Sequence, residues 1–201
     1  MRTILFILLA LAVMSVPVLA GDKKEEAAVA EITRLGGKLE YDSGAADKHV
    51  IKVDLSNSAV TDGDMRYLLD FKKLEWLDVR VTRIGDGGTQ YIGFLKNLKF
   101  LNIARTNVTN AGLARLKNLD DLETLLMAHT KVTDEGLAAV RKFSKLKKLS
   151  LFKTAVTDDG LKHLEKLASL EVLIVGGSKV SEAGTAAIQK ALPKVRFTEN
   201  T

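Results

Sequence analysis

The stretch from Leu146 to Leu167 reads LKKLSLFKTAVTDDGLKHLEKL and contains two hydrophobic periods. Leu149 and Leu151 stand two residues apart, which predicts a short strand that buries alternate side chains. After the Thr157-Asp158 pair the leucines stand three residues apart, which predicts a short helix whose first backbone N–H groups are capped by the threonine. The stretch therefore predicts one strand, one turn and one helix.

The same unit recurs every 24 residues, without insertion or deletion. Each unit opens with a pair of apolar residues: Val53 and Leu55, Leu77 and Val79, Leu101 and Ile103, Leu125 and Met127, Leu149 and Leu151, Leu173 and Val175. Glycine recurs in the same register at positions 88, 112, 136, 160 and 184. One unit cannot bury its own apolar side, so we expect the copies to stack into an α/β solenoid. Its parallel sheet would line the concave face of a horseshoe segment, with short helices on the convex face.

The pattern L-x-x-L-x-L-x-x-T-x-V-T-D-x-G-L-x-x-L-x-x-L resembles the leucine-rich repeat family. Its VTDxGL run is similar to the repeats of F-box proteins, and more similar still to small exported bacterial repeat proteins. No F-box segment precedes the repeats, and threonine or serine stands where the family often has asparagine or cysteine. The resemblance implies a leucine-rich repeat solenoid that acts by binding, and it does not support a role as ubiquitin-ligase adaptor.

The first 20 residues have the pattern of a secretory signal peptide. Arg2 gives a charged start, Ile4 to Met14 form an apolar run, and small residues precede Gly21. The run is too short to span a bilayer and is followed by Ser15 and Pro17, so we expect no stable membrane insertion after cleavage. An exported chain without cysteine must be stable without disulfides, which favours a bacterial protein that is periplasmic or secreted.

Four segments are expected along the chain. Residues 1–20 would be the signal peptide, 21–49 an N-terminal helical cap, 50–191 the six repeats, and 192–201 a C-terminal cap strand. The cap helix is predicted over Glu25 to Leu35 and an edge strand over Lys38 to Tyr41. At the other end, Pro193 leads into a terminal strand through Val195 and Phe197.

Composition and motifs exclude several classes of function. Thirty Lys and Arg against 25 Asp and Glu give a formal net charge of +5, spread too diffusely to predict nucleic-acid binding. The absence of cysteine excludes disulfide scaffolds, thiolate zinc sites and cysteine nucleophiles. The chain contains no G-x-S-x-G and no HExxH motif, so we expect no catalytic centre, no metal and no cofactor.

The register identifies the side chains that project from the concave face. Large apolar side chains there are not needed for the core of the solenoid, and basic residues surround them. An apolar patch with a basic rim is typical of a protein-binding surface, and tryptophan and arginine are enriched among the residues that dominate binding energy. The predicted contact residues are Trp76, Asp78, Arg80, Phe100, Arg105, Leu126, His129, Lys148, Phe152, Lys153 and Ile174.

Three other patterns favour a structural interpretation. The column of acidic or amide residues at 62, 86, 110, 134, 158 and 182 lies in the first helical turns, where negative charge is stabilising, and it supplies too few oxygens for calcium. The hydroxyls at 82, 106, 130 and 154 are expected to bond loop backbone between repeats. The glycine-rich turn from Ile84 to Thr89 lacks the residues of a phosphate-binding loop and is expected to be loose.

The preferred hypothesis is an exported module that docks a protein, a peptide or a glycan on its concave face. Trp76 and Phe100 would be the anchors, and the basic rim would select an acidic ligand. A regulator or inhibitor of a secreted enzyme would differ only in its partner. One alternative is a cell-envelope or matrix component that binds acidic polysaccharide through its basic surface. Another is a hydrolase that uses Asp54 and Asp78, which neighbouring strands should place about 5 Å apart.

Overall fold

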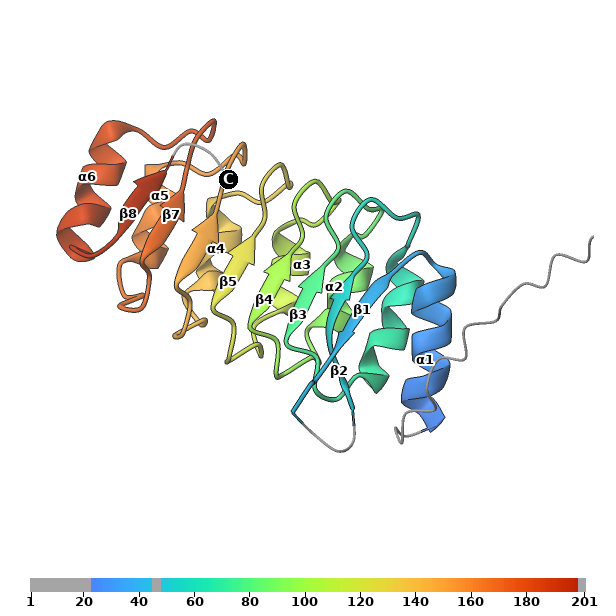
Figure 1. Cartoon of the computed structure of the whole chain (residues 1–201). Coiled ribbons are helices and arrows are strands. Elements are labelled where there is room, and N and C mark those ends of the chain that lie inside the picture. The colour runs from blue at the N-terminus through green and yellow to red at the C-terminus, as the bar shows by residue number, and fades with distance from the viewer. Residues whose placement is uncertain (1–22, 45–47, 199–201) are drawn as a thin grey trace, which may run out of the picture.

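The computed structural model of the chain describes residues 23–44 and 48–198, so the predicted signal peptide lies outside the described residues. In the described part eight strands form one sheet, in the order in which they occur along the sequence (Figure 1). The strands are β1 Lys38–Tyr41, β2 Val50–Asp54, β3 Trp76–Asp78, β4 Phe100–Asn102, β5 Thr124–Leu126, β6 Lys148–Ser150, β7 Val172–Ile174 and β8 Arg196–Thr198. β1 pairs antiparallel with β2, and every later pair is parallel.

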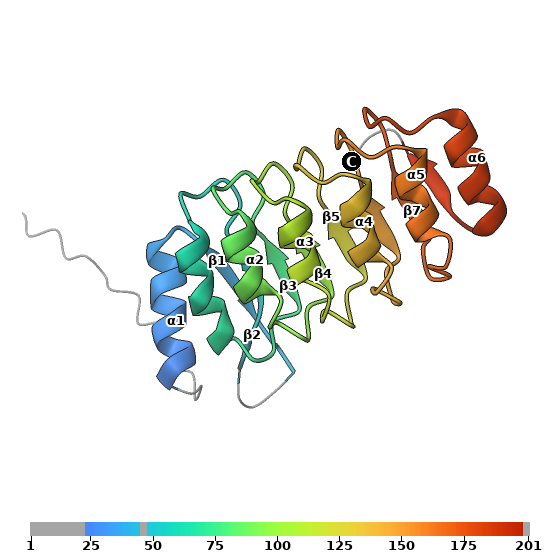
Figure 2. The ribbon, with the colours of Figure 1, turned by 180° about the vertical axis from the view of Figure 1, so that it is seen from behind.

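The helices lie together on one side of the sheet (Figures 1 and 2). They are α1 Lys23–Arg34, the 3-10 helix η1 Asp62–Asp70, α2 Asp86–Ile92, α3 Asn110–Arg115, α4 Asp134–Val140, α5 Asp158–Leu161 with its 3-10 continuation η2 Lys162–Leu164, and α6 Glu182–Ala191. Strands and helices alternate around a parallel sheet, which confirms the predicted α/β solenoid. We call the side of the sheet that carries no helix the strand face.

The pairing register repeats the 24-residue period. Leu77 pairs with Leu101 and Leu101 pairs with Leu125, so equivalent residues of successive repeats stand beside one another. Side chains alternate across a strand, so these leucines point toward the helices while the residues next to them point to the strand face.

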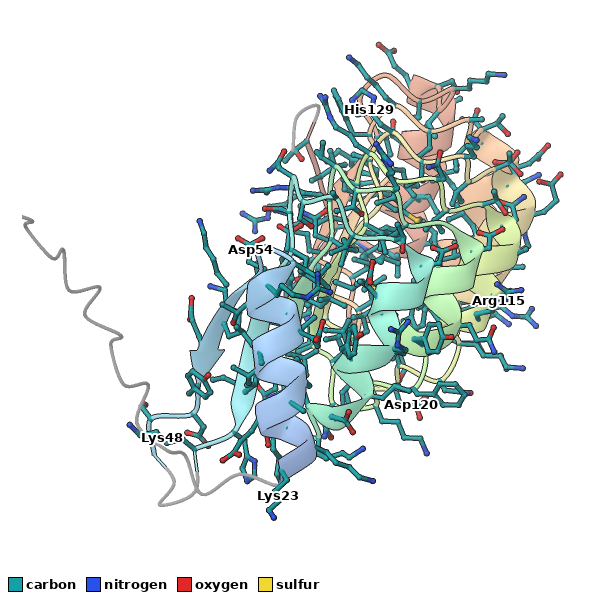
Figure 3. All side chains as sticks on the ribbon, turned by 90° about the vertical axis from the view of Figure 1, so that its right-hand side faces the viewer. Lys23, Lys48, Asp54, Arg115, Asp120 and His129 are labelled. Atoms are coloured by element: carbon teal, nitrogen blue, oxygen red, sulfur yellow. The ribbon has the colours of Figure 1, made fainter. Side chains whose placement is uncertain are left out.

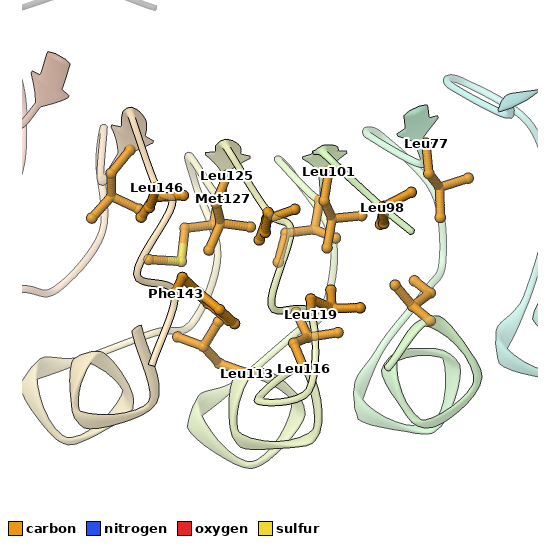
Figure 4. Close-up of a cluster of buried hydrophobic side chains, with 14 of the residues drawn as sticks. Leu77, Leu98, Leu101, Leu113, Leu116, Leu119, Leu125, Met127, Phe143 and Leu146 are labelled. Atoms are coloured by element: carbon orange, nitrogen blue, oxygen red, sulfur yellow. The ribbon is translucent and has the colours of Figure 1, made fainter. Parts of the chain in front are cut away.

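One continuous hydrophobic core fills the space between the sheet and the helices (Figure 4). Leu101 from β4 and Leu113 and Leu116 from the helical side of the same repeat all belong to this core, and all three are fully buried. Phe143 occupies the register position of Leu119 and fills the same layer one repeat further on. Each repeat is covered by its two neighbours, which is why the fold requires the period to continue.

The acidic column does more than stabilise helix ends. The side chains at 62, 86, 110, 134 and 158 each reach forward to the next repeat. Asp86 accepts hydrogen bonds from the Thr109 backbone N–H at 2.8 Å and from its hydroxyl at 2.7 Å. Asp134 makes the same two contacts with Thr157, both at 2.7 Å. The column therefore fastens successive repeats together at the loops that begin the helices.

The glycine column provides the space that these carboxylates occupy. A β-carbon at Gly160 would approach the Asp134 carboxylate more closely than 3.0 Å, and one at Gly184 would do the same to Asp158. Real β-carbons essentially never approach other heavy atoms so closely. Glycine and aspartate are therefore a matched pair, one from each of two adjacent repeats.

The glycine-rich turn of the second repeat is tightly packed, so the prediction of a loose turn is wrong. The Gly85 N–H donates to the Asp62 carboxylate at 2.6 Å, and β-carbons at Gly87 and Gly88 would collide with the same side chain. Thr89, at the end of this turn, is fully buried. These glycines allow the backbone to close around Asp62.

The buried hydroxyls donate hydrogen bonds within their own repeats, so the prediction that they bond loop backbone between repeats is wrong. Thr106 Oγ1 donates to the Ile103 carbonyl at 2.6 Å, and Thr130 Oγ1 donates to the Met127 carbonyl at 2.7 Å. The acceptor stands three residues before the donor in each case, so each bond closes the turn that follows a strand.

The chain ahead of the first repeat is tied to the solenoid by a buried carboxylate. Ala28 and Ile32 of α1 belong to the core. Glu25, in the first turn of α1, is 6% exposed and accepts a hydrogen bond from the Val50 N–H at 2.7 Å. The Glu25 carboxylate also lies 3.0 Å from the His49 ring nitrogen. This end of the core is covered by α1 while β1 extends the sheet.

Candidate functional site: the strand face

The predicted contact residues differ in how far solvent reaches them. Arg80, Arg105 and Lys153 are exposed, while Trp76, Phe100, Leu126, His129, Lys148 and Phe152 are half-buried. Asp78 and Ile174 are only 2% and 1% exposed, so the prediction that both project freely from the face is wrong. Ile174 is paired with Ser150 in one adjacent strand and with Thr198 in the other.

Asp78 is buried because the sheet itself uses its carboxylate. One oxygen accepts the Arg80 backbone N–H at 2.9 Å, and the other accepts the Asn102 amide at 3.1 Å and lies 3.5 Å from the Arg80 guanidinium. Burial raises the pKa of Asp78 above its ordinary value, although these hydrogen bonds and the charge of Arg80 act in the opposite direction. Asp78 therefore stabilises the sheet and is not open to a partner.

An aromatic stack lies at the start of β3 and β4. Trp76 and Phe100 are paired in register, and their rings stack with centroids 4.7 Å apart and planes inclined by 8°. The Lys52 ammonium lies 4.5 Å from the Trp76 ring centroid, and Glu40 in turn pairs with Lys52 at 2.7 Å. The cation–π contact of Lys52 was not predicted from the sequence. The stack is rigid before any partner arrives, because each member is held by its neighbours.

A second aromatic cluster lies beyond the ends of β5 and β6. The His129 and Phe152 rings meet edge to face with centroids 5.6 Å apart, and the Lys153 ammonium lies 5.2 Å from the Phe152 centroid. Partial burial lowers the pKa of His129, and the charges of Arg105 and Lys153 lower it further. Figure 3 shows His129 at the edge of the molecule that also carries Asp54. The positive environment therefore disfavours protonation of the imidazole.

A hollow of about 480 Å³ adjoins this second cluster. Its lining includes Arg80, Arg105, Leu126, His129 and Phe152. Leu126 stands at the end of β5, two residues beyond the partner of Phe100, so the apolar side chains run diagonally across the strand face from Trp76 to Phe152. The lining therefore combines the apolar side chains of Leu126 and Phe152 with the basic side chains of Arg80 and Arg105. We call the residues at the loop ends of the strands, such as Arg105 and His129, the border residues.

The border residues project from an unusual backbone column. Asn57, Val81, Arg105, His129 and Lys153 all have positive φ, between 53° and 59°, and Gly177 continues the column with 68°. A left-handed conformation costs a non-glycine residue about 1–2 kcal/mol. These six positions are equivalent in the six repeats, which indicates that the repeat structure itself imposes the conformation. It therefore also fixes the backbone positions from which the border side chains project.

The Asp54 and Asp78 pair has the register expected of neighbouring carboxylates but not the access that catalysis requires. Burial raises the pKa of Asp54, but hydrogen bonds from Ser56 and the charges of Arg80 and Lys38 outweigh it, so the pKa lies below its ordinary value. Asp78 has both oxygens engaged and is closed to solvent. The pair thus offers a substrate at most one carboxylate.

Two further searches concern only the residues that the structure describes. Within them, no group of three or more His, Cys, Asp or Glu side chains is arranged to hold a metal ion. None of the described helices combines the length and apolar character needed to cross a membrane.

Comparison with known proteins identifies the architecture. Models of known protein families and curated protein sequences gave no match to the chain. Among solved structures, the chain is similar to the internalin inlF from Listeria monocytogenes, with a TM-score of 0.56 and 15% identity over 86% of this chain and 54% of that one. It is also similar to internalin C2 of the same bacterium, with a TM-score of 0.54 and 18% identity over 88% of this chain and 82% of that one. The chain has the leucine-rich repeat fold.

These likenesses establish the fold alone, because the sequence identities are low. The chain spans about half the length of inlF. Leucine-rich repeat solenoids in general present an extended surface to protein partners, since stacked repeats create a long face that no part of the repeat itself covers. In this chain the strand face, with its aromatic stack and its hollow, is the side of the sheet that carries no helix.

Proposed function

We propose that this chain is an exported, non-catalytic interaction module that binds a protein or peptide on its strand face. Residues 1–20 would direct export to the periplasm or the medium, 21–49 and 192–201 would cap the solenoid, and 50–191 would carry the binding surface. The repeats would belong with the VTDxGL type found in small exported bacterial proteins. A secreted enzyme as partner would make the chain its regulator or inhibitor.

The stacked Trp76–Phe100 pair is the observation that carries this proposal. The solenoid core is complete without it, because Leu77 and Leu101 fill the buried side of the same strands. Both rings are half-buried on the strand face and are held by their stack and by Lys52 on Trp76, so little entropy would be lost when a partner packs against them. Aromatic anchors of this kind supply most of the free energy in many protein interfaces.

The test is capture of partners from the exported fraction of the source organism, followed by affinity measurement on each captured protein. The full chain is compared with the double variant Trp76→Ala/Phe100→Ala. Phe94→Ala is the matched control, since Phe94 is an aromatic residue with 63% exposure outside the strand face. We expect Trp76→Ala alone to weaken binding by about 2 kcal/mol or more, and Phe94→Ala to have no effect.

The acidic-polysaccharide alternative predicts a different pattern. Arg105 makes no ion pair within the described part of the chain, and such free cations would retain a polyanion through charge alone. Retention would then be lost on adding salt and would not depend on Trp76 or Phe100. A captured protein that binds the double variant as well as the unchanged chain would contradict the proposal.

A further inference from the structure

The first three repeats satisfy one backbone donor on the strand face with their own side chains. Asp54 accepts the N–H of Ser56 at 2.9 Å, and Asp78 accepts the N–H of Arg80 at the same distance. Asn102 accepts the N–H of Ala104 at 3.1 Å. In each repeat the acceptor side chain ends the strand and the donor stands two residues later. The donor N–H is therefore reached from the strand face.

The last three repeats break this rule: Leu126 and Ile174 carry no acceptor, and Ser150 Oγ is buried without a hydrogen-bond partner among the described residues. Of the three, the fourth repeat contributes Leu126 to the hollow. Leu126 occupies the position of Asp78 and Asn102, and its side chain has no acceptor. The N–H of Ala128 consequently has no hydrogen-bond acceptor among the described residues, although Ala128 is only 5% exposed. A buried backbone N–H without an acceptor is uncommon, because it costs free energy comparable to a lost hydrogen bond. Ala128 and Leu126 both line the hollow.

The side chains that line the hollow around this N–H are basic, apolar or amide groups, and the amides are those of Asn57 and Asn102. The Arg105 N–H donates to the Ala128 carbonyl at 2.8 Å, which places the two residues side by side. Arg80 and His129 line the same hollow, and Lys153 lies next to it on Phe152. Among the described residues no carboxylate lines the hollow, and that of Asp78, which contacts the lining residue Asn102, is buried and engaged with Asn102 and Arg80. An anion entering the hollow would therefore meet a donor and a net positive field.

We propose that the hollow binds the carboxylate of an aspartate or glutamate side chain of a protein partner, with the Ala128 N–H and the Arg105 guanidinium as donors. The partner's carboxylate would take the place that the Asp78 and Asn102 side chains hold in the repeats before it. Leu126 and Phe152 would contact an apolar residue next to that carboxylate, which a peptide offers and a uniformly charged polysaccharide does not. The inference rests on the proposed function and names the chemistry that its partner must carry.

The probe is sodium acetate, titrated into the ¹⁵N-labelled full chain and followed by NMR, with sodium chloride at equal ionic strength as reference. We expect a saturable downfield shift of the Ala128 amide proton and a rise in the pKa of His129, since a bound anion offsets the charges that lower it. The Ala104 amide is the internal control, because Asn102 already occupies it. Leu126→Asn should restore the internal acceptor and weaken acetate binding at least tenfold, and Arg105→Gln should weaken it as well.

Each alternative result has a defined meaning. Equal shifts of Ala128 with chloride and with acetate, or an unchanged response in Leu126→Asn, would overturn the carboxylate site. A second arm compares a peptide containing a Leu-Glu pair with oligogalacturonate at equal carboxylate concentration; tighter binding of the oligogalacturonate would overturn the choice of a protein side chain. If a captured partner is lost with Trp76→Ala but binds Leu126→Asn normally, the strand face is the docking site and only this inference fails. If acetate binds at Ala128 while no partner depends on Trp76, the proposed function fails instead.

Discussion

The matched pair formed by Asp158 and Gly184 gives the sharpest test of how the repeats are joined. Asp158 accepts the Ser181 N–H at 2.8 Å and the Ser181 hydroxyl at 2.6 Å. The three atoms nearest to a β-carbon built on Gly184 all belong to Asp158. Gly184→Ala should therefore displace the carboxylate and break both hydrogen bonds, whereas in the Asp158→Ala variant only the β-carbon of residue 158 remains of these three atoms, 3.1 Å from the added carbon.

The expected free energies follow from these contacts. Two hydrogen bonds at this exposed site are worth about 1 kcal/mol each, so Asp158→Ala should destabilise by about 2 kcal/mol. Alanine within a helix is favoured over glycine by about 0.7 kcal/mol. Gly184→Ala should therefore destabilise the unchanged chain by about 1.3 kcal/mol, but stabilise the Asp158→Ala variant by about 0.7 kcal/mol. The predicted coupling in the double-mutant cycle is about 2 kcal/mol, with a change of sign.

The assay is urea unfolding followed by far-ultraviolet circular dichroism on the four proteins of the cycle. Asp158→Asn is a matched control, because Asn110 makes the equivalent contacts with Thr133 in an earlier repeat. Asparagine keeps the bulk of the side chain, so Gly184→Ala should remain destabilising beside it. The change in the free energy of unfolding caused by Gly184→Ala is compared between the unchanged chain, Asp158→Ala and Asp158→Asn. If the three changes agree within about 0.5 kcal/mol, the idea that the glycine column provides space for the carboxylates is refuted.

Two further predictions concern the core and the buried carboxylate. Leu125→Ala should lower the free energy of unfolding by about 2–5 kcal/mol, because Leu125 is fully buried beneath the sheet; a melting temperature equal to that of the unchanged chain would contradict its place in the core. Asp78 has a raised pKa in the folded chain, so its contribution to stability is fully present below the unfolded value of 3.8 and is lost as pH rises through the folded value. Urea unfolding at several pH values should therefore show Asp78→Asn gaining stability relative to the unchanged chain above about pH 4; a difference that stays constant with pH would count against this burial effect.

The fold could be predicted from the sequence because every repeat must satisfy the same packing constraints. Leu101 and Leu125 stand in register with identical surroundings, so a periodic row of leucines directly reports which side of each strand is buried. The acidic column was seen as well, but its main contacts could not be derived. The contacts of Asp134 with Thr157 depend on how one repeat is displaced from the next, and a sequence period contains no information on that displacement.

The strand face was predictable in outline and not in detail, for a related reason. Periodicity identified which residues share the face and thus brought Trp76 and Phe100 together. It could not show that Asp78 is closed off by Asn102, since exposure on a sheet depends on the length and orientation of neighbouring side chains. The sequence did contain a signal for the unpaired N–H of Ala128, but the prediction missed it. Leu126 is the first residue of its column without an acceptor oxygen.

In a repeat protein the departures from the period are therefore more informative about function than the period itself. The leucine, aspartate and glycine columns are nearly uniform because packing requires the same residue in every repeat. The strand-face column that contains Trp76 instead changes from lysine to aromatic residues, threonine, lysine and valine, although each of these positions has the same backbone surroundings. Core packing does not require one residue type at these positions, so they can differ between repeats and can serve the proposed contacts with a partner. Leu126 goes one step further, because it stands where Asn102 supplies an acceptor in the preceding repeat. The Ala128 N–H is therefore buried and unsatisfied, although an asparagine at 126 would satisfy it. The proposed partner would supply the missing acceptor with its carboxylate.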